Sequence, residues 1–144
     1  MRSIQLLSAS VFAAVLLFLA ALHVYWARGG DWGSSVIVPT ISGRRIINPT
    51  PLATYIVAFL LVMGAVTVCG EVHLFATGRF SPLFHIASWC LCGVFLLRAV
   101  GDFNTFGIFK TVRETAFAYW DTHLFSPLCV VLAALAAVVS LRPD

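Results

Sequence analysis

The chain has 144 residues, of which 60% are hydrophobic and only 10% are charged. An ordinary soluble domain carries about 25% charged residues, so this composition excludes a water-soluble fold and leaves no room for a separate soluble domain. The net charge of +3 comes from cations scattered along the chain rather than from a basic stripe, which excludes nucleic acid as a partner and favours contact with membrane lipid phosphates.

Four segments combine low charge with enough length to cross a membrane as helices. A membrane-spanning helix needs about 20 residues, and the predicted helices cover about 4–28, 51–77, 82–100 and 127–142. The apolar part of the first segment is too long for a signal peptide, so this segment is expected to be retained. We therefore predict an all-α fold in which residues 1–144 form one four-helix transmembrane bundle.

The predicted helix ends carry recognisable capping residues. A Ser or Thr directly before a proline indicates an N-cap, and this pattern occurs at Thr50, Ser81 and Ser126. A glycine after an apolar run suits a left-handed C-terminal cap, and this occurs at Gly29, Gly78 and Gly101. These residues predict three helix starts and three helix ends.

Four crossings place both termini on one side of the membrane, together with the tight turn at 78–81. We call this side the terminal face, and we call the side with loops 28–50 and 101–125 the loop face. The cations of the loop face are Arg28, Arg44, Arg45, Arg98, Lys110 and Arg113, against Arg2, Arg79 and Arg142 on the terminal face. The positive-inside rule then predicts a cytoplasmic loop face, in the plasma membrane of a bacterium.

The second loop is predicted to contain a short amphipathic helix that lies in the membrane interface. Its apolar side would consist of Phe106, Phe109, Val112, Ala116, Phe117 and Trp120. Lys110 and Glu114 fall on the opposite, polar side of the helical wheel. Aromatic residues also gather at this end of the bundle, as an interfacial belt requires.

Polar residues that could form a binding site gather at the loop face. His23 and Arg98 each lie about one turn inside a predicted helix, where an ionisable side chain needs a reason. Asp102 follows Arg98 by four residues, so the two are expected to pair on one helix face. The candidate ligand-binding residues around this aromatic-walled cavity are His23, Trp26, Arg98, Asp102, Asp121 and His123. A purely structural role, with Arg98 tying down the loop, is the alternative.

A second polar group, formed by Glu71, His73 and His85, is expected at the terminal face. Two histidine pairs at opposite membrane surfaces, His23 with His123 and His73 with His85, resemble the pattern of a bis-histidine haem electron carrier. Ordinary interfacial histidines explain the same pattern, so we expect no cofactor. No H-E-x-x-H or comparable spacing is present, and no metal site is predicted.

Four sequence blocks resemble a known family. They are Ala-Leu-His-Val-Tyr-Trp-Ala at 21–27, Gly-Gly-Asp-Trp-Gly at 29–33, Arg-Ala-Val-Gly-Asp-Phe at 98–103 and Trp-Asp-Thr-His-Leu-Phe-Ser-Pro-Leu-Cys at 120–129. The chain resembles, over nearly its whole length, the bacterial integral-membrane family catalogued as domain of unknown function 3995. The resemblance implies four membrane helices and no assigned reaction. The positions that match the family pattern are His23, Trp26, Trp32, Arg98, Asp102, Lys110, Asp121 and Ser126.

The leading functional hypothesis is a multi-pass membrane protein that binds a lipid headgroup or a small amphipathic molecule at the loop face. Arg98 would hold an anion or Asp102, and His23 would line the cavity. Three rival hypotheses are a membrane enzyme that uses His23, Asp121 and His123 for acid–base chemistry, a haem electron carrier, and an accessory subunit of a membrane complex. An enzyme is the less favoured class, and the sequence sets no oligomeric state.

Overall fold

The computed structural model describes residues 2–38, 40–41, 44–45 and 49–141. Within these ranges the elements in chain order are α1 (Arg2–Ala27), α2 (Ser34–Ile37), β1 (Thr40–Ile41), β2 (Arg44–Arg45), α3 (Pro51–Glu71), the 3-10 turn η1 (Gly78–Phe80), α4 (Ser81–Val100), α5 (Ala116–Trp120), the π-helical turn η2 (Asp121–Phe125) and α6 (Ser126–Ser140). Strands β1 and β2 pair antiparallel.

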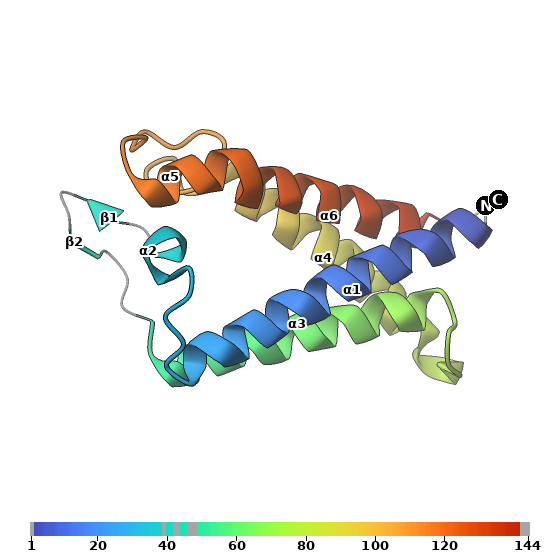
Figure 1. Cartoon of the computed structure of the whole chain (residues 1–144). Helices are drawn as coiled ribbons and strands as arrows, with labels where there is room; N and C mark the ends of the chain where they lie inside the picture. Colours follow the sequence, from blue (N-terminus) through green and yellow to red (C-terminus); the bar gives the residue numbers. More distant parts are fainter. Residues whose placement is uncertain (1, 39, 42–43, 46–48, 142–144) are drawn as a thin grey trace.

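The predicted four-helix fold is confirmed. The helical stretches Arg2–Ala27, Pro51–Glu71, Gly78–Val100 and Ala116–Ser140 are each long and apolar enough to cross a membrane. The start of α1, the end of α6 and the turn between α3 and α4 lie at one end of the bundle, and α2, α5 and the small strand pair lie at the other (Figure 1). The terminal face and the loop face are therefore real ends of the molecule, and the side of the membrane that each faces stays a prediction.

The core of the bundle is built mainly from small and medium apolar side chains. Helix α1 packs against α3 and α6, and α4 packs against α6 and α3. Phe12 and Leu16 of α1 are fully buried, and the Phe12 ring meets the Phe95 ring edge-on with centroids 5.6 Å apart. Alanines such as Ala65, Ala133 and Ala136 let the helices approach closely, as membrane helix packing favours.

Several predicted helix ends are corrected by the structure. The Thr50 hydroxyl accepts a hydrogen bond from the Ala53 amide at 3.2 Å, so this N-cap is confirmed. The other two predicted N-caps, Ser81 and Ser126, are the first residues of α4 and α6 and follow helical turns without a side-chain cap. Thr115 instead caps the fourth helical stretch, because its hydroxyl accepts from the Ala118 amide at 3.1 Å.

Glycine ends α1 and α4 as predicted, but it does not end α3. Gly29, two residues after the end of α1, and Gly101, directly after α4, have positive φ angles of 91° and 88°. Helix α3 stops at Glu71 rather than near 77, and His73 takes a positive φ of 55° in the turn that follows. Gly78 opens η1 instead of closing α3. The predicted end of the last helix at 142 lies outside the described residues.

The predicted interfacial amphipathic helix in the second loop is not confirmed. Residues 101–115 form turns and bends, and helix begins only at Ala116, where it runs into α6. The reason is that the loop amides bond across the loop or to the Asp102 and Asp121 carboxylates rather than along a helix. The Asn104 carbonyl accepts from the Val112 amide at 2.9 Å, and the Lys110 ammonium is drawn into the protein interior.

The packing of α1 makes a direct prediction. Leu16→Ala removes a fully buried side chain at the centre of the bundle and is expected to lower the free energy of unfolding by about 2–5 kcal/mol. Leu17→Ala is the matched control, because the neighbouring Leu17 side chain is 50% exposed and faces outward. Chemical or thermal unfolding in mild detergent measures both, and equal losses for the two variants would contradict the assigned core.

Candidate functional site

The carboxylate of Asp121 joins two cations at the loop face. Asp121 has no exposed surface. Its Oδ1 accepts from Arg98 Nη2 at 2.8 Å, and its Oδ2 accepts from Lys110 Nζ at 3.0 Å. Oδ2 also accepts from the Gly107 amide at 2.7 Å and from Ser126 Oγ at 3.2 Å. One buried carboxylate thus links α4, the second loop and α6.

Lys110 is a buried ammonium whose donors are all used. The residue is only 3% exposed. Besides Asp121, its Nζ donates to the Gly107 carbonyl at 3.1 Å and to Thr122 Oγ1 at 2.7 Å. A lysine ammonium has three donors, and complete satisfaction of this kind is what makes a buried charge tolerable. The polar-face position predicted for Lys110 on an amphipathic helix is therefore wrong.

Arg98 is the more exposed of the two cations in this cluster. Its guanidinium lies over the Phe106 ring, 4.8 Å from the centroid, in a cation–π contact. The side chain remains 33% exposed. Its Nη1 atom is buried and, within the described part of the chain, has no hydrogen-bond partner. With two cations against one carboxylate, the cluster carries a net charge of +1.

The π-helical turn η2 explains how Asp121 and Ser126 meet. In a regular α-helix, residues five apart differ by about 140° around the axis and do not share a face. A π turn uses i→i+5 hydrogen bonds, which bring such residues one above the other. The Ser126 amide donates to the Asp121 carbonyl, and the Ser126 hydroxyl donates to the Asp121 carboxylate. The turn therefore positions the carboxylate and one of its donors together.

Two glycines let the loop backbone cross the end of α4. Gly101 and Gly107 have φ angles of 88° and 93°, in the left-handed region. A Cβ on Gly101 would overlap the Phe106 carbonyl oxygen, and a Cβ on Gly107 would overlap the Val100 carbonyl oxygen and the Gly101 backbone. Glycine is the residue that fits such a crossing. The crossing aims the Gly107 amide at Asp121.

Asp102 holds the loop and does not pair with Arg98 as predicted. Its Oδ1 accepts from the amides of Asn104, Thr105 and Phe106 at 2.9, 2.7 and 3.0 Å, and the Thr105 hydroxyl donates to Oδ2. The cause is that α4 ends at Val100, and the chain leaves the helix at Gly101 before Asp102 can face Arg98.

Hydrogen bonding to Asp102 also sets its charge state. Partial burial by itself raises the pKa of the carboxyl, but the bonds from Phe106, Thr105 and Asn104 outweigh it and hold the pKa well below its usual range. The pKa of Asp102 is lower in the folded state than in the unfolded state. Ionised Asp102 therefore stabilises the fold at pH values above the ordinary pKa of an aspartate. The contribution is lost only as the pH falls through the depressed folded-state pKa.

His23 and Trp26 line a separate cavity at the same end of the molecule. His23 Nδ1 hydrogen-bonds the Leu19 carbonyl at 2.7 Å, and its ring meets Trp26 edge-on with centroids 5.2 Å apart. The cavity has a volume of about 220 Å³ and is mostly apolar; its lining residues are His23, Trp26, Ile37, Val38, Pro49, Ala53, Thr54 and Val57. None of the other four candidate residues lines it.

His123 lies apart from both groups. Its Nδ1 donates to the Tyr119 carbonyl at 2.8 Å, and its ring stacks on the Tyr119 ring at 4.3 Å on the exposed surface. The structure therefore joins Arg98 to Asp121 and His23 to Trp26, and leaves Asp102 and His123 in other contacts. In the described ranges, no three or more His, Cys, Asp or Glu side chains are grouped to hold a metal.

The glycine crossing predicts a sharp dependence on side-chain size. Gly107→Ala is expected to lower the free energy of unfolding by about 2–5 kcal/mol, because it adds both a strained φ and a backbone overlap. Gly93→Ala is the matched control, since no atom lies within 4 Å of its added Cβ and a mid-helix alanine is favoured over glycine. Unfolding in detergent compares them, and a neutral Gly107→Ala would refute the crossing.

Because Asp121 balances two cations, removal of its negative charge is predicted to lower the stability of the fold strongly. Asp121→Asn leaves two cations without a counter-charge and is expected to destabilise the fold by about 3–5 kcal/mol. Asp31→Asn, an exposed acid of the same face, should change the stability by less than about 0.5 kcal/mol. Adding Lys110→Met to Asp121→Asn should recover part of the loss. Thermal unfolding reports all three, and equal stability of the two single variants would rule out a charge hub.

Comparison with known proteins identifies the family. The family model described as "Protein of unknown function (DUF3995)" matches residues 16–136, a range that includes Arg98, Lys110 and Asp121. No curated protein and no solved structure matches the chain. The match extends over most of the 144 residues and agrees with the resemblance carried by the four sequence blocks. The chain therefore belongs to the family of proteins of unknown function DUF3995.

Proposed function

We propose that the loop face binds an anionic group at Arg98, either the headgroup of a membrane lipid or the polar end of a small amphipathic molecule. The net positive charge of the cluster formed by Arg98, Lys110 and Asp121 supports an anion rather than a cation as the ligand. Arg98 lies in the last turn of α4, at the end of a membrane-spanning stretch. Lipid phosphates are found at that depth.

The observation that carries this proposal is the unpartnered Nη1 of Arg98. A buried donor without an acceptor loses the hydrogen bonds that water gave it, at a penalty of about 1–3 kcal/mol. A planar guanidinium offers paired donors that match the oxygens of a phosphate or carboxylate. One edge already holds Asp121, and the Phe106 ring covers one face. An oxyanion at Nη1 would complete the set.

The cavity beside His23 and Trp26 supports the amphipathic part of the proposal. Its wall is formed by apolar side chains of α1, α3 and the segment around α2. Helix α2 packs against α5, which leads directly into Asp121. The apolar cavity and the charged cluster are therefore connected by one packed contact, and an amphipathic molecule has a place for an apolar portion and a place for an anion on the same face.

The geometry gives less support to acid–base catalysis. Both oxygens of Asp121 accept hydrogen bonds from cations, which stabilises the ionised form and opposes proton uptake. His123 lies on the exposed surface against Tyr119, and His23 lies in the other cavity. A general base must reach the proton that it removes, and these three side chains do not converge. The haem carrier and the accessory subunit stay predictions of the sequence.

The test is lipid retention by Arg98 variants. Wild-type protein purified in mild detergent is expected to retain phosphatidylglycerol over phosphatidylcholine, as measured by mass spectrometry. Arg98→Gln should reduce that retention by about tenfold, the effect of losing one charge-assisted contact. Arg98→Lys should fall between the two because it keeps the charge without the planar donors.

Arg113→Gln is the matched control, because Arg113 is an exposed cation of the same loop. Folded Arg98→Gln that retains as much phosphatidylglycerol as wild type would refute the proposal. If Arg98→Gln does not fold, the proposal is tested on the wild-type protein alone. Its thermal stability is then expected to rise more with added phosphatidylglycerol than with added phosphatidylcholine. An equal rise for both lipids would overturn an anion site.

A further inference from the structure

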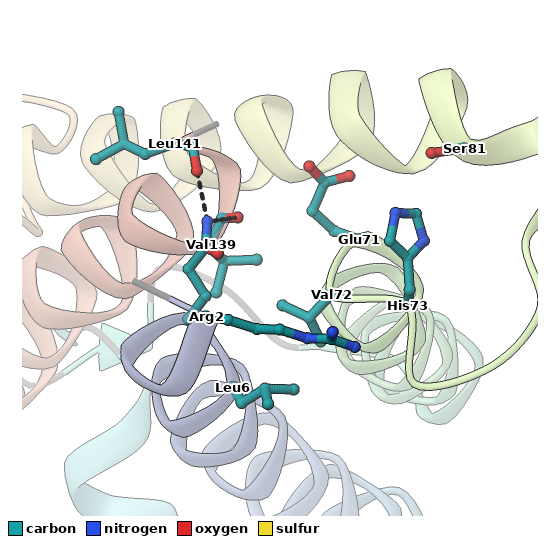
Figure 2. Close-up of a pocket in the computed structure, with 9 residues that line it drawn as sticks. Arg2, Leu6, Glu71, Val72, His73, Ser81, Val139 and Leu141 are labelled. Atoms are coloured by element: carbon teal, nitrogen blue, oxygen red, sulfur yellow. Dashed lines mark hydrogen bonds between the residues drawn. The ribbon is translucent and has the colours of Figure 1, made fainter. Parts of the chain in front are cut away.

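The terminal face holds a cavity that is larger and more polar than the cavity beside His23 and Trp26. It has a volume of about 580 Å³, within the range of small-molecule sites, and it lies between the ends of the four long helices. Its lining residues are Arg2, Gln5, Leu6, Glu71, Val72, His73, Ser81, Val139 and Leu141 (Figure 2). The sequence predicts a second polar group of Glu71, His73 and His85 on this face, but no cavity.

Glu71 is a buried acid with unused capacity in this cavity. It is the last residue of α3, and its side chain is only 8% exposed. Its Oε1 accepts from His85 Nδ1 of α4 at 2.7 Å. Within the described ranges its other oxygen has no hydrogen bond, and Glu71 is one of the residues that line the cavity. A carboxylate in this position can accept from a ligand.

Arg2 supplies the opposite charge without neutralising Glu71. In the view of Figure 2 its side chain extends beneath Val72 toward His73, while the Glu71 carboxylate lies above Val72. Among the described residues Arg2 forms no ion pair, and the only partner of that kind for Glu71 is His85. The cavity therefore carries a guanidinium and a carboxylate that face the same space and do not meet.

Two separated charges of opposite sign select the ligand. An anion without a positive group would be repelled by the Glu71 carboxylate, and a cation without a negative group would be repelled by Arg2. We infer that the terminal-face cavity binds a small zwitterion, with its ammonium at Glu71 and its oxyanion at Arg2. The ammonium must carry N–H donors, because the Glu71 carboxylate is an acceptor only. A phosphoethanolamine group has this chemistry, either as a lipid headgroup or as a free molecule.

Binding of the two sources is measured separately on the full-length protein. Nanodiscs that contain phosphatidylethanolamine, phosphatidylglycerol and phosphatidylcholine in equal parts test the lipid, with retained lipid counted by native mass spectrometry. Calorimetric titration with free phosphoethanolamine, against glycerol phosphate, tests the soluble zwitterion. We expect about a tenfold preference for the ethanolamine compound in one of these assays. Preference in the first alone identifies the lipid, and preference in the second identifies a soluble zwitterion.

Variants assign the binding to this cavity. Arg2→Gln and Glu71→Gln are each expected to abolish the preference, whereas Arg79→Gln should keep it, since Arg79 lies on the same face against Phe80 and does not line the cavity. Leu6→Phe fills the cavity without changing any charge and should also abolish binding, which separates loss of the site from loss of the Glu71 contact with His85. No preference in either assay, or an unchanged preference in Arg2→Gln and Leu6→Phe, would overturn the inference.

Discussion

The loop face depends on one constraint, which is that a single buried carboxylate must compensate two cations. Asp121 does so for Arg98 from α4 and Lys110 from the second loop. In a medium of low dielectric constant neither cation could remain in place alone, so the three segments that carry these residues are fixed relative to one another. The glycine crossing, the π turn and the burial of Lys110 all serve this contact.

The membrane setting explains why the contact involves so many backbone groups. Loops near the bilayer must satisfy their polar groups within the protein, because lipid offers no hydrogen bonds. Asp102 accepts hydrogen bonds from the amides at the start of the loop, and Asp121 accepts one from the amide of Gly107. Lys110 donates a hydrogen bond to the Gly107 carbonyl. An irregular segment of about fifteen residues is thereby held without a helix of its own.

The fold could be predicted from the sequence because its signals lie within the segments that they specify. These signals are the long apolar runs, Thr50 before a proline and the glycines after helices. It failed at the site where the decisive contacts are not local. Four-residue spacing paired Arg98 with Asp102, but the true partner, Asp121, is 23 residues away. Burial of Lys110 could not be read from a helical wheel, since it follows from a chain crossing that only Gly101 and Gly107 permit. The closest signal was the shared occurrence of Arg98, Lys110, Asp121 and Ser126 in the family pattern.

The two ends of the bundle solve the problem of charge near a membrane in opposite ways. At the loop face opposite charges are in direct contact, and the buried Nη1 of Arg98 has no partner among the described residues. At the terminal face Arg2 and Glu71 line one cavity but form no pair. Paired charges mainly fix a structure, whereas charges that are held apart keep most of their capacity for a ligand. The terminal face, which the sequence marks as the sparser end, therefore has the more open binding chemistry.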